Sequence, residues 1–222
     1  TLAPTQPPSK QRQQPAQDAV VGPCCGVRLP RALCLHGFRS SSDILRHQLA
    51  PHLRACAAAV EWVFVDAPRR ATGPAHDGAF APLDTYEWCG AVGGPFDTAW
   101  RDEDGLADSL AALASHGMFD GAVGFSQGGA LATCIPTRWL ALFSTVPPPA
   151  GRASSALDAR ASFHCYDPAE EGAADCARVQ RGFDAPSVAL HDEGHRVSAR
   201  ADIVAAFCTF VDAAVASAAS GL

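Results

Sequence analysis

Lysine is almost absent from this chain, and acidic residues outnumber basic ones. Lys10 is the single lysine among 17 basic residues, against 23 acidic residues, which gives a net charge of −6. Proteins that bind nucleic acid use a positive field to attract the phosphates. The composition therefore argues against a nucleic-acid partner.

Cys-x-x-Cys motifs and long apolar runs are also missing. The nine cysteines form an odd set, and apart from the adjacent Cys24-Cys25 pair they are scattered. Scattered cysteines in apolar segments are typical of reduced thiols, so we expect a reducing, cytoplasmic location and no structural zinc. We see no run long enough to span a membrane, and we expect neither a membrane partner nor a cofactor.

The start of the chain has few apolar side chains. Residues 1–17 are rich in Pro and Gln and lack the apolar core of a secretion signal. Such a composition predicts disorder, so we assign residues 1–27 to a disordered tail. The whole chain is 48% hydrophobic, enough for one core, and we expect residues 28–219 to form a single domain.

The most informative motif is Gly124-Phe125-Ser126-Gln127-Gly128. A serine with glycine two residues away on each side is typical of a nucleophile elbow, where a β-carbon at either glycine would collide with neighbouring backbone. The context agrees, because an apolar strand pattern over 119–125 precedes it and a helical pattern over 128–135 follows, ended by Pro136. The motif predicts that Ser126 is a nucleophile; the alternative is an ordinary serine in a glycine-rich turn.

A serine nucleophile needs a histidine base, which in this arrangement lies later in the chain. His195 follows the apolar run 186–190 and Gly194, at a strand-end position before a terminal helix. His164 alternates with apolar neighbours inside a predicted strand and is expected to be packed. The spacing of His191 and His195 would suit a metal on a helix, but the glycine argues against a helix, so we expect no metal site.

The acid that orients the base is expected after the predicted strand 161–166. Asp167, Glu170 and Glu171 all follow it. One of them would hold the imidazole of His195 in the tautomer that accepts the serine proton. The pattern does not choose between Asp167 and Glu170, and all three also fit a solvated helix start.

The oxyanion formed in acyl transfer needs two backbone donors. The residue after the nucleophile, Gln127, supplies one N–H, and the segment 32–38 reads as a first strand and its loop, which supplies the other from Phe38 or Arg39. His36 in that loop is expected to be structural.

Helical and extended patterns alternate along the chain, which predicts the α/β class with a parallel sheet. Ser42-Asp43 is expected to cap a helix that carries leucines at every fourth residue, and a second helix is expected to stop at Gly117. A last helix from Ser198 is expected to bury Ile203, Phe207, Phe210 and Val211.

Several motifs together resemble the FSH family of small α/β-hydrolases, over about residues 30 to 215. They are Leu35-His36-Gly37-Phe38, Val65-Asp66-Ala67-Pro68, Phe119-Asp120-Gly121, the elbow and Gly194-His195. The family includes esterases similar to ovarian-cancer-associated protein 2 and fungal thioesterases that release polyketide chains. The resemblance implies the α/β-hydrolase fold, a doubly wound, mostly parallel sheet flanked by helices. It also implies hydrolysis of small-molecule acyl esters or thioesters, with an acyl-carrier protein as a candidate partner.

The resemblance carries the nucleophile to Ser126 and the base to His195. Such proteins usually show Gly-x-x-Asp after the penultimate strand, whereas this chain has Asp167-Pro168-Ala169-Glu170. That places Glu170 at the acid position, with Asp167 as the alternative. The departure also keeps a rival function open, a catalytically weak pseudo-hydrolase that binds a small molecule.

The segment between Asp66 and Gly105 has no clear periodicity but contains Trp88 and Trp100. Long irregular segments in compact domains often form lids or binding loops. We expect these tryptophans, with Phe125, to line an acyl pocket. The alternative is an aromatic cluster that anchors a surface loop. The oligomeric state is not written in these patterns.

Overall fold

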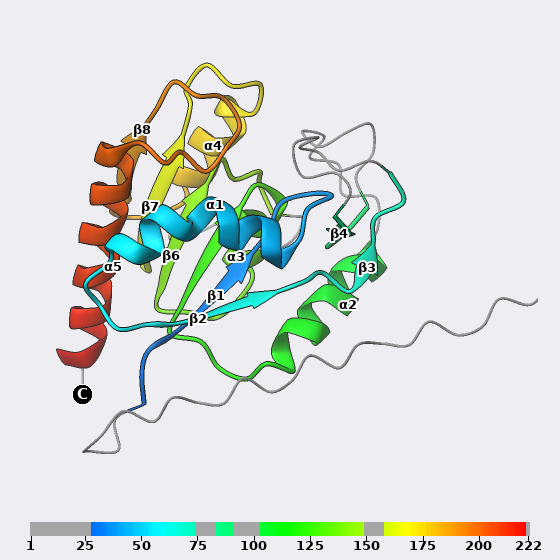
Figure 1. The fold of residues 1–222 in the computed structure, drawn as a ribbon, viewed down its shortest axis with the longest axis horizontal. Helices are drawn as coiled ribbons and strands as arrows, with labels where there is room; N and C mark the ends of the chain where they lie inside the picture. The colour runs from blue at the N-terminus through cyan, green and yellow to red at the C-terminus, as the bar shows by residue number, and fades with distance from the viewer. Residues whose placement is uncertain (1–27, 74–82, 91–102, 149–157, 221–222) are drawn as a thin grey trace, which may run out of the picture.

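The computed structural model describes residues 28–73, 83–90, 103–148 and 158–220, and its centre is a parallel sheet (Figure 1). The strand order is β2-β1-β5-β6-β7-β8, and all five strand pairs are parallel. The strands are β1 (Arg31–Leu35), β2 (Glu61–Val65), β5 (Gly121–Phe125), β6 (Trp139–Phe143), β7 (Ala161–Tyr166) and β8 (Ser187–Leu190). This confirms the predicted α/β-hydrolase architecture. The predicted tail, residues 1–27, lies outside the described residues.

Helices cover both faces of the sheet. The described helices are α1 (Ser42–Ala55), α2 (Glu103–Ala114), α3 (Gln127–Thr133), α4 (Ala173–Gln180) and α5 (Ala201–Ser220). Side chains alternate along β1, so Cys34 joins a core cluster with α1 and α5, whereas Leu35 joins the cluster with α2, α3 and α4. A separate antiparallel pair joins β3 (Arg69–Arg70) to β4 (Tyr86–Glu87).

The chain reverses direction across the sheet at β1. From β1 it passes through α1 to β2 on one side, and β5 then pairs with β1 on the other side. Ligands of open α/β sheets bind outside the carboxyl ends of the strands at such a switch point. The loop after β1 and the elbow after β5 therefore meet where a binding site is expected.

Two local features differ from the sequence-based expectations. The N-cap of α1 is Ser41, whose Oγ accepts a hydrogen bond from the N–H of Ile44 at 3.3 Å, so the expected cap at Ser42-Asp43 was wrong by one residue. Strand β6 was not predicted. Its five residues are all buried, so it lacks the alternation that marks a half-exposed strand.

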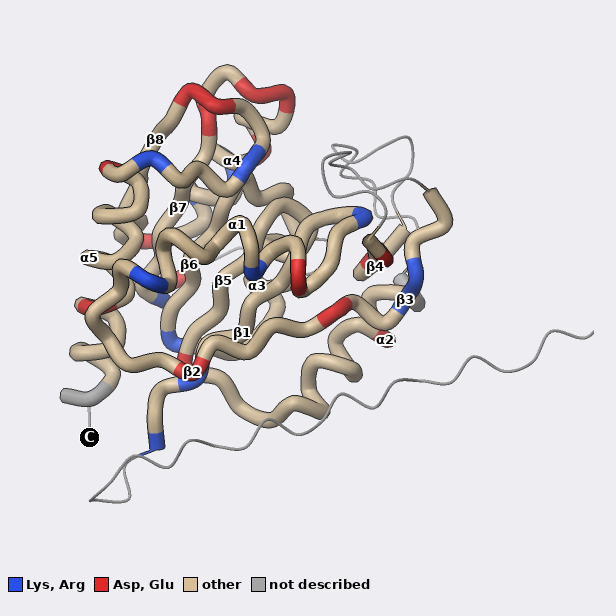
Figure 2. Tube along the Cα trace, viewed as in Figure 1, with Lys and Arg blue, Asp and Glu red and all other residues tan. Residues whose placement is uncertain are grey.

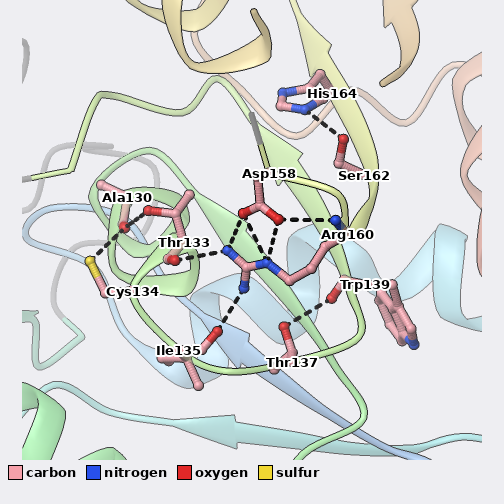
Figure 3. Close-up of polar contacts among 10 residues, drawn as sticks. All are labelled: Ala130, Thr133, Cys134, Ile135, Thr137, Trp139, Asp158, Arg160, Ser162 and His164. Carbon is pink, nitrogen blue, oxygen red and sulfur yellow. Dashed lines mark hydrogen bonds and ion pairs between the residues drawn. The ribbon is translucent and has the colours of Figure 1, made fainter. Parts of the chain in front are cut away.

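Arg160 holds the far end of α3, the helix that follows the elbow (Figure 3). Its guanidinium donates to the carbonyl oxygens of Ile135 at 2.7 Å and Thr133 at 2.9 Å, and Asp158 accepts from its Nε at 2.9 Å. A cation at a helix C-terminus also complements the helix dipole. Residues 133–138 and Arg160 line an open hollow at the edge of the sheet where the strands begin, which is the edge opposite Ser126.

The C-terminal helix α5 is long and strongly apolar. Its segment Ala201–Ala218 meets the length and composition of a membrane span, so the statement that no run is long enough was wrong. In this structure Ile203, Phe207 and Val211 are buried in the core cluster with α1 and the sheet, as predicted, and Phe210 packs against this cluster while only partly buried. Core packing therefore accounts for the apolar face of this helix.

Candidate active site

Ser126 sits in a strained turn between β5 and α3. Its backbone has φ 53° and ψ −119°, and the residue is 2% exposed. The N–H of Ser126 donates to the carbonyl of Phe143 at 2.9 Å, and its own carbonyl accepts from Gly129 and Ala130. A non-glycine residue at positive φ costs energy and persists only where the surroundings enforce it. This is the backbone shape of a nucleophile elbow.

The two glycines of the motif have the steric role that the sequence predicts. A β-carbon on Gly124 would lie 2.4 Å from the Cα of Gly129. A β-carbon on Gly128 would lie 2.3 Å from the carbonyl oxygen of Leu35, at the end of β1. The motif thus brings α3 against β5 and against the loop that follows β1.

His195 and Glu170 meet at the elbow although 25 residues separate them in the chain. The imidazole ring of His195 lies against the ring of Phe125, with 5.0 Å between the ring centroids. Its Nδ1 is 2.9 Å from Oε2 of Glu170, and the glutamate side chain is 2% exposed. Because a carboxylate only accepts hydrogen bonds, Nδ1 of a neutral His195 carries the proton and Nε2 is the basic nitrogen.

Asp167 occupies a different position from the one an orienting acid needs. Its two carboxylate oxygens accept the backbone N–H groups of Ala169 and Gly194, each at 2.7 Å. These hydrogen bonds hold the pKa of Asp167 below its ordinary value. Asp167 therefore ties the acid loop to the base loop, and Glu170 is the carboxylate that the structure places beside His195.

Cys176, which the sequence analysis did not single out, contacts the carboxylate of Glu170. The thiol of Cys176, in α4, lies 3.3 Å from Oε1 of Glu170 and is 3% exposed. Burial, and next the charge of Glu170, raise the pKa of Cys176, so the thiol keeps its proton and donates it to the carboxylate. The one available signal was the spacing of Cys176 and Val179 on the buried face of α4.

Removing this donor is expected to lower the turnover number. Cys176→Ala leaves Oε1 of Glu170 buried without this hydrogen bond, so we expect kcat to fall by about threefold to tenfold as the carboxylate shifts. Cys176→Ser restores a donor and is expected to retain most of the activity. The measurement is kcat on one ester substrate.

Cys134 offers the matched control for the Cys176 variants. Its thiol also donates to an oxygen, the carbonyl of Ala130 at 3.7 Å, but it lies at the far end of α3 (Figure 3). An equal loss of kcat in Cys134→Ala and Cys176→Ala would show that the Cys176 thiol has no particular effect on Glu170.

The loop after β1 is held by His36, which is structural as predicted. Nε2 of His36 accepts the backbone N–H of Ala67 at 3.1 Å, so Nδ1 carries the proton and donates to the carbonyl of Gly37 at 2.8 Å. Burial lowers the pKa of His36 to about 4, which keeps the ring neutral at physiological pH. The carboxylate of Asp66 in turn accepts the N–H of Ser42 at the start of α1, at 2.7 Å.

The three residues expected to line the pocket have different positions. Phe125 lies against the base, as described above. Trp100 lies outside the described residues. Trp88 has no exposed surface, and its indole N–H donates to the carbonyl of His36 at 2.8 Å. A side chain buried in this way exposes no surface to a pocket, so for Trp88 the anchoring alternative fits and the pocket role does not.

A strained serine after β5, a buried loop after β1 and a carboxylate-oriented histidine are features of serine hydrolases. The family model described as "Serine hydrolase (FSH1)" matches residues 27–151, more than half of the chain. The chain belongs to the FSH1 serine hydrolase family. The matched region contains the elbow and the loop after β1 and ends before the loops of Glu170 and His195.

Two curated relatives of this FSH1 family member are esterases. The chain is 33% identical over 141 residues to esterase alnB of Emericella nidulans, a match that covers 53% of this chain and 44% of that protein. It is 30% identical over 104 residues to esterase GA18864 of Drosophila pseudoobscura pseudoobscura, covering 44% of this chain and 36% of that protein. The matched part is thus less than half the length of each relative.

Solved structures share the fold at lower sequence identity. Esterase PE8 has a TM-score of 0.63 and 17% identity, covering 85% of this chain and 94% of that chain. A carboxylesterase from Mesorhizobium loti has a TM-score of 0.58 and 18% identity, covering 82% of this chain and 88% of that chain. These likenesses show the α/β-hydrolase fold.

Proposed function

We propose that this FSH1 family member hydrolyses carboxylic esters through a triad of Ser126, His195 and Glu170. The observation that carries the proposal is the Glu170–His195 pair, with 2.9 Å between Oε2 and Nδ1, whose imidazole ring lies against Phe125, the residue before Ser126. These residues come from three loops, and they meet at the carboxyl ends of parallel strands, where the fold family places its catalytic groups.

The reaction follows from the roles of these side chains. Nε2 of His195 takes the proton of Ser126 as its Oγ attacks the acyl carbonyl, and Glu170 stabilises the imidazolium that forms. The protonated His195 then gives its proton to the departing alcohol or thiol. Water attacks the acyl-enzyme with His195 again as base, which frees the acid product and Ser126.

The tetrahedral oxyanion would be bound by the backbone N–H groups of Gln127 and Phe38. Gln127 is the first residue of α3, where N–H groups have no carbonyl partner inside the helix. Phe38 follows His36 and Gly37 in the loop after β1, at the same carboxyl edge of the sheet. Loss of one oxyanion donor typically costs about 3 kcal/mol of transition-state stabilisation.

Charge near the site favours uncharged substrates. Acidic residues gather on the loops that follow β7 and β8 (Figure 2): Glu171, Asp192 and Glu193 near the surface, and the buried Asp167 and Glu170. Arg196 and Arg200 offset part of this charge, and Arg200 pairs with Asp192 at 2.7 Å. The remaining negative charge disfavours polyanionic leaving groups such as coenzyme A relative to small neutral alcohols. We therefore propose neutral acyl esters as the main substrates, ahead of thioesters of coenzyme A.

Labelling with a fluorophosphonate tests the proposal directly. We expect the native protein to gain one adduct by intact mass, because the probe reacts with a serine that a working base activates. We expect Ser126→Ala to gain no adduct and to lose ester hydrolysis while keeping its circular dichroism spectrum. No adduct on the folded native protein would contradict the proposal and favour the binding-protein alternative.

A further inference from the structure

Trp88 is hydrogen-bonded to three separate elements through three of its polar atoms. Its backbone N–H donates to Oε1 of Gln127 at 3.2 Å, and its indole Nε1 donates to the carbonyl of His36 at 2.8 Å. Its own carbonyl accepts from Oγ of Ser109, in α2, at 2.6 Å. Trp88, His36 and Ser109 have no exposed surface, and Gln127 is 5% exposed.

On one side Trp88 fixes the loop after β1. Its indole lies 4.9 Å from the His36 imidazole, between ring centroids, with 31° between the planes. His36 in turn donates from Nδ1 to the carbonyl of Gly37. That carbonyl belongs to the same planar peptide group as the N–H of Phe38, so fixing one fixes the direction of the other.

On the other side Trp88 fixes the residue after the nucleophile. The amide of Gln127 accepts from the N–H of Trp88 and donates to the carbonyl of Cys89 at 3.0 Å. Both ends of the Gln127 side chain are therefore bonded to consecutive residues of one backbone segment. This holds the Cα of Gln127, and with it the direction of its own N–H.

We propose that Trp88 is a positioning residue that sets the distance between the two oxyanion donors, the N–H groups of Phe38 and Gln127. This inference rests on the proposed function, because it explains how the donors of that reaction are held. Trp88 is fully buried and exposes no surface to a substrate. It joins the two backbone segments that must converge on one oxygen, and Ser109 anchors it to α2.

Trp88→Phe tests the proposal because it keeps most of the volume and removes the indole N–H. The carbonyl of His36 then loses this buried donor, and the loop can shift relative to the elbow. We expect kcat for a neutral ester to fall about tenfold, with KM changed by less than about twofold, because the oxyanion exists only after attack. The rate of fluorophosphonate labelling is expected to fall in parallel.

Trp139→Phe is the matched control. Trp139 is 1% exposed, and its indole N–H has no acceptor among the described residues (Figure 3). The same substitution there removes an unpaired donor at the start of β6. We expect kcat within about twofold of the native value.

A second pair of variants decides the matter if Trp88→Phe does not fold. Ser109→Ala removes the bond that anchors Trp88 and changes little volume, whereas Ser115→Ala removes an exposed bond of the same length, 2.6 Å, to Ala112. We expect only Ser109→Ala to lower kcat, by about threefold to tenfold, again at nearly constant KM.

The outcomes separate this inference from the proposed function. If the native protein labels and turns over esters, but Trp88→Phe matches Trp139→Phe, or Ser109→Ala matches Ser115→Ala, the positioning role is wrong and the proposed function stands. A rise of KM at constant kcat would also overturn it, since that result indicates a substrate contact. If the native protein neither labels nor hydrolyses, the proposed function fails first and this inference fails with it.

Discussion

Glu170→Gln is expected to lower kcat by about three to four orders of magnitude at nearly constant KM. The carboxamide can present its NH₂ group to Nδ1 of His195, which would then accept, and the proton would move to Nε2. In that tautomer the imidazole no longer accepts the proton of Ser126. The amide also lacks the charge that stabilises the imidazolium in the transition state.

Asp167→Asn is the matched variant, because both substitutions turn a buried carboxylate into an amide three residues apart. Asp167 accepts the N–H groups of Ala169 and Gly194, and the amide oxygen of Asn can still accept one of them. We expect kcat to fall by about tenfold or less, with a lower unfolding free energy. The measurement is kcat and KM for both variants on one ester.

Glu170→Asp refines the same test. The shorter side chain withdraws the carboxylate from His195 by about one methylene, while it keeps the charge, so we expect a loss of about tenfold to a hundredfold. Full activity of Glu170→Gln together with inactivity of Asp167→Asn would move the acid to Asp167.

The elbow was predictable because its signal is local. Gly124 is required by the close approach of Gly129 in the following helix, whereas Gly128 is required by the close approach of the Leu35 carbonyl at the end of β1. Both requirements fall on fixed positions of one short motif, so the spacing alone carries the information. Strand β7 was predicted with its observed bounds, Ala161–Tyr166, for a similar reason, since its alternation lies within the strand itself.

The acid could not be chosen from the pattern alone because the choice depends on the shape of one turn. The N–H of Glu170 donates to the carbonyl of Asp167 at 3.1 Å, and this turn sends the two carboxylates in different directions. The resemblance to the family motif favoured Glu170, and the 2.9 Å distance between its Oε2 and Nδ1 of His195 supports that choice.

The role of Trp88 could not be predicted from the local sequence. Its aromatic side chain in an irregular segment is equally typical of a pocket wall and of an anchor. Only the tertiary structure places His36, Ser109 and Gln127 around it, from segments up to 52 residues away. Burial of this kind is a property of the fold and not of the local sequence.

Acid is expected to unfold this protein between about pH 6.5 and pH 4 through three buried histidines. Burial is the largest cause that lowers the pKa of His36, His52 and His164 from 6.5 to about 4. Below pH 6.5 the unfolded chain binds protons at these side chains, whereas the folded chain binds them only near pH 4. Unfolding then takes up protons, so stability is complete above pH 6.5 and falls as the pH is lowered.

The size of this effect is comparable with the total stability of a domain. Each histidine contributes about 3 kcal/mol across the window, and the three together contribute roughly 10 kcal/mol, against about 5–15 kcal/mol for a typical domain. We expect the unfolding free energy to fall from pH 7 to pH 5 with a slope of up to about 4 kcal/mol per pH unit. The urea midpoint is expected to fall with it. The measurement is urea unfolding at several pH values in one ionic strength.

His52 provides the variant that isolates one of the three. It is fully buried in α1, edge-on to the rings of Phe143 and Phe207, at 5.4 Å and 5.2 Å between centroids. His52→Leu fills that apolar site without a titratable group, so unfolding takes up one proton fewer. The slope of the unfolding free energy against pH is therefore expected to fall by about 1.4 kcal/mol per pH unit. His47→Leu, an exposed position on the same helix, controls for the loss of a surface histidine. An unchanged slope in His52→Leu would mean that the buried ring is not one of the groups that couple folding to pH.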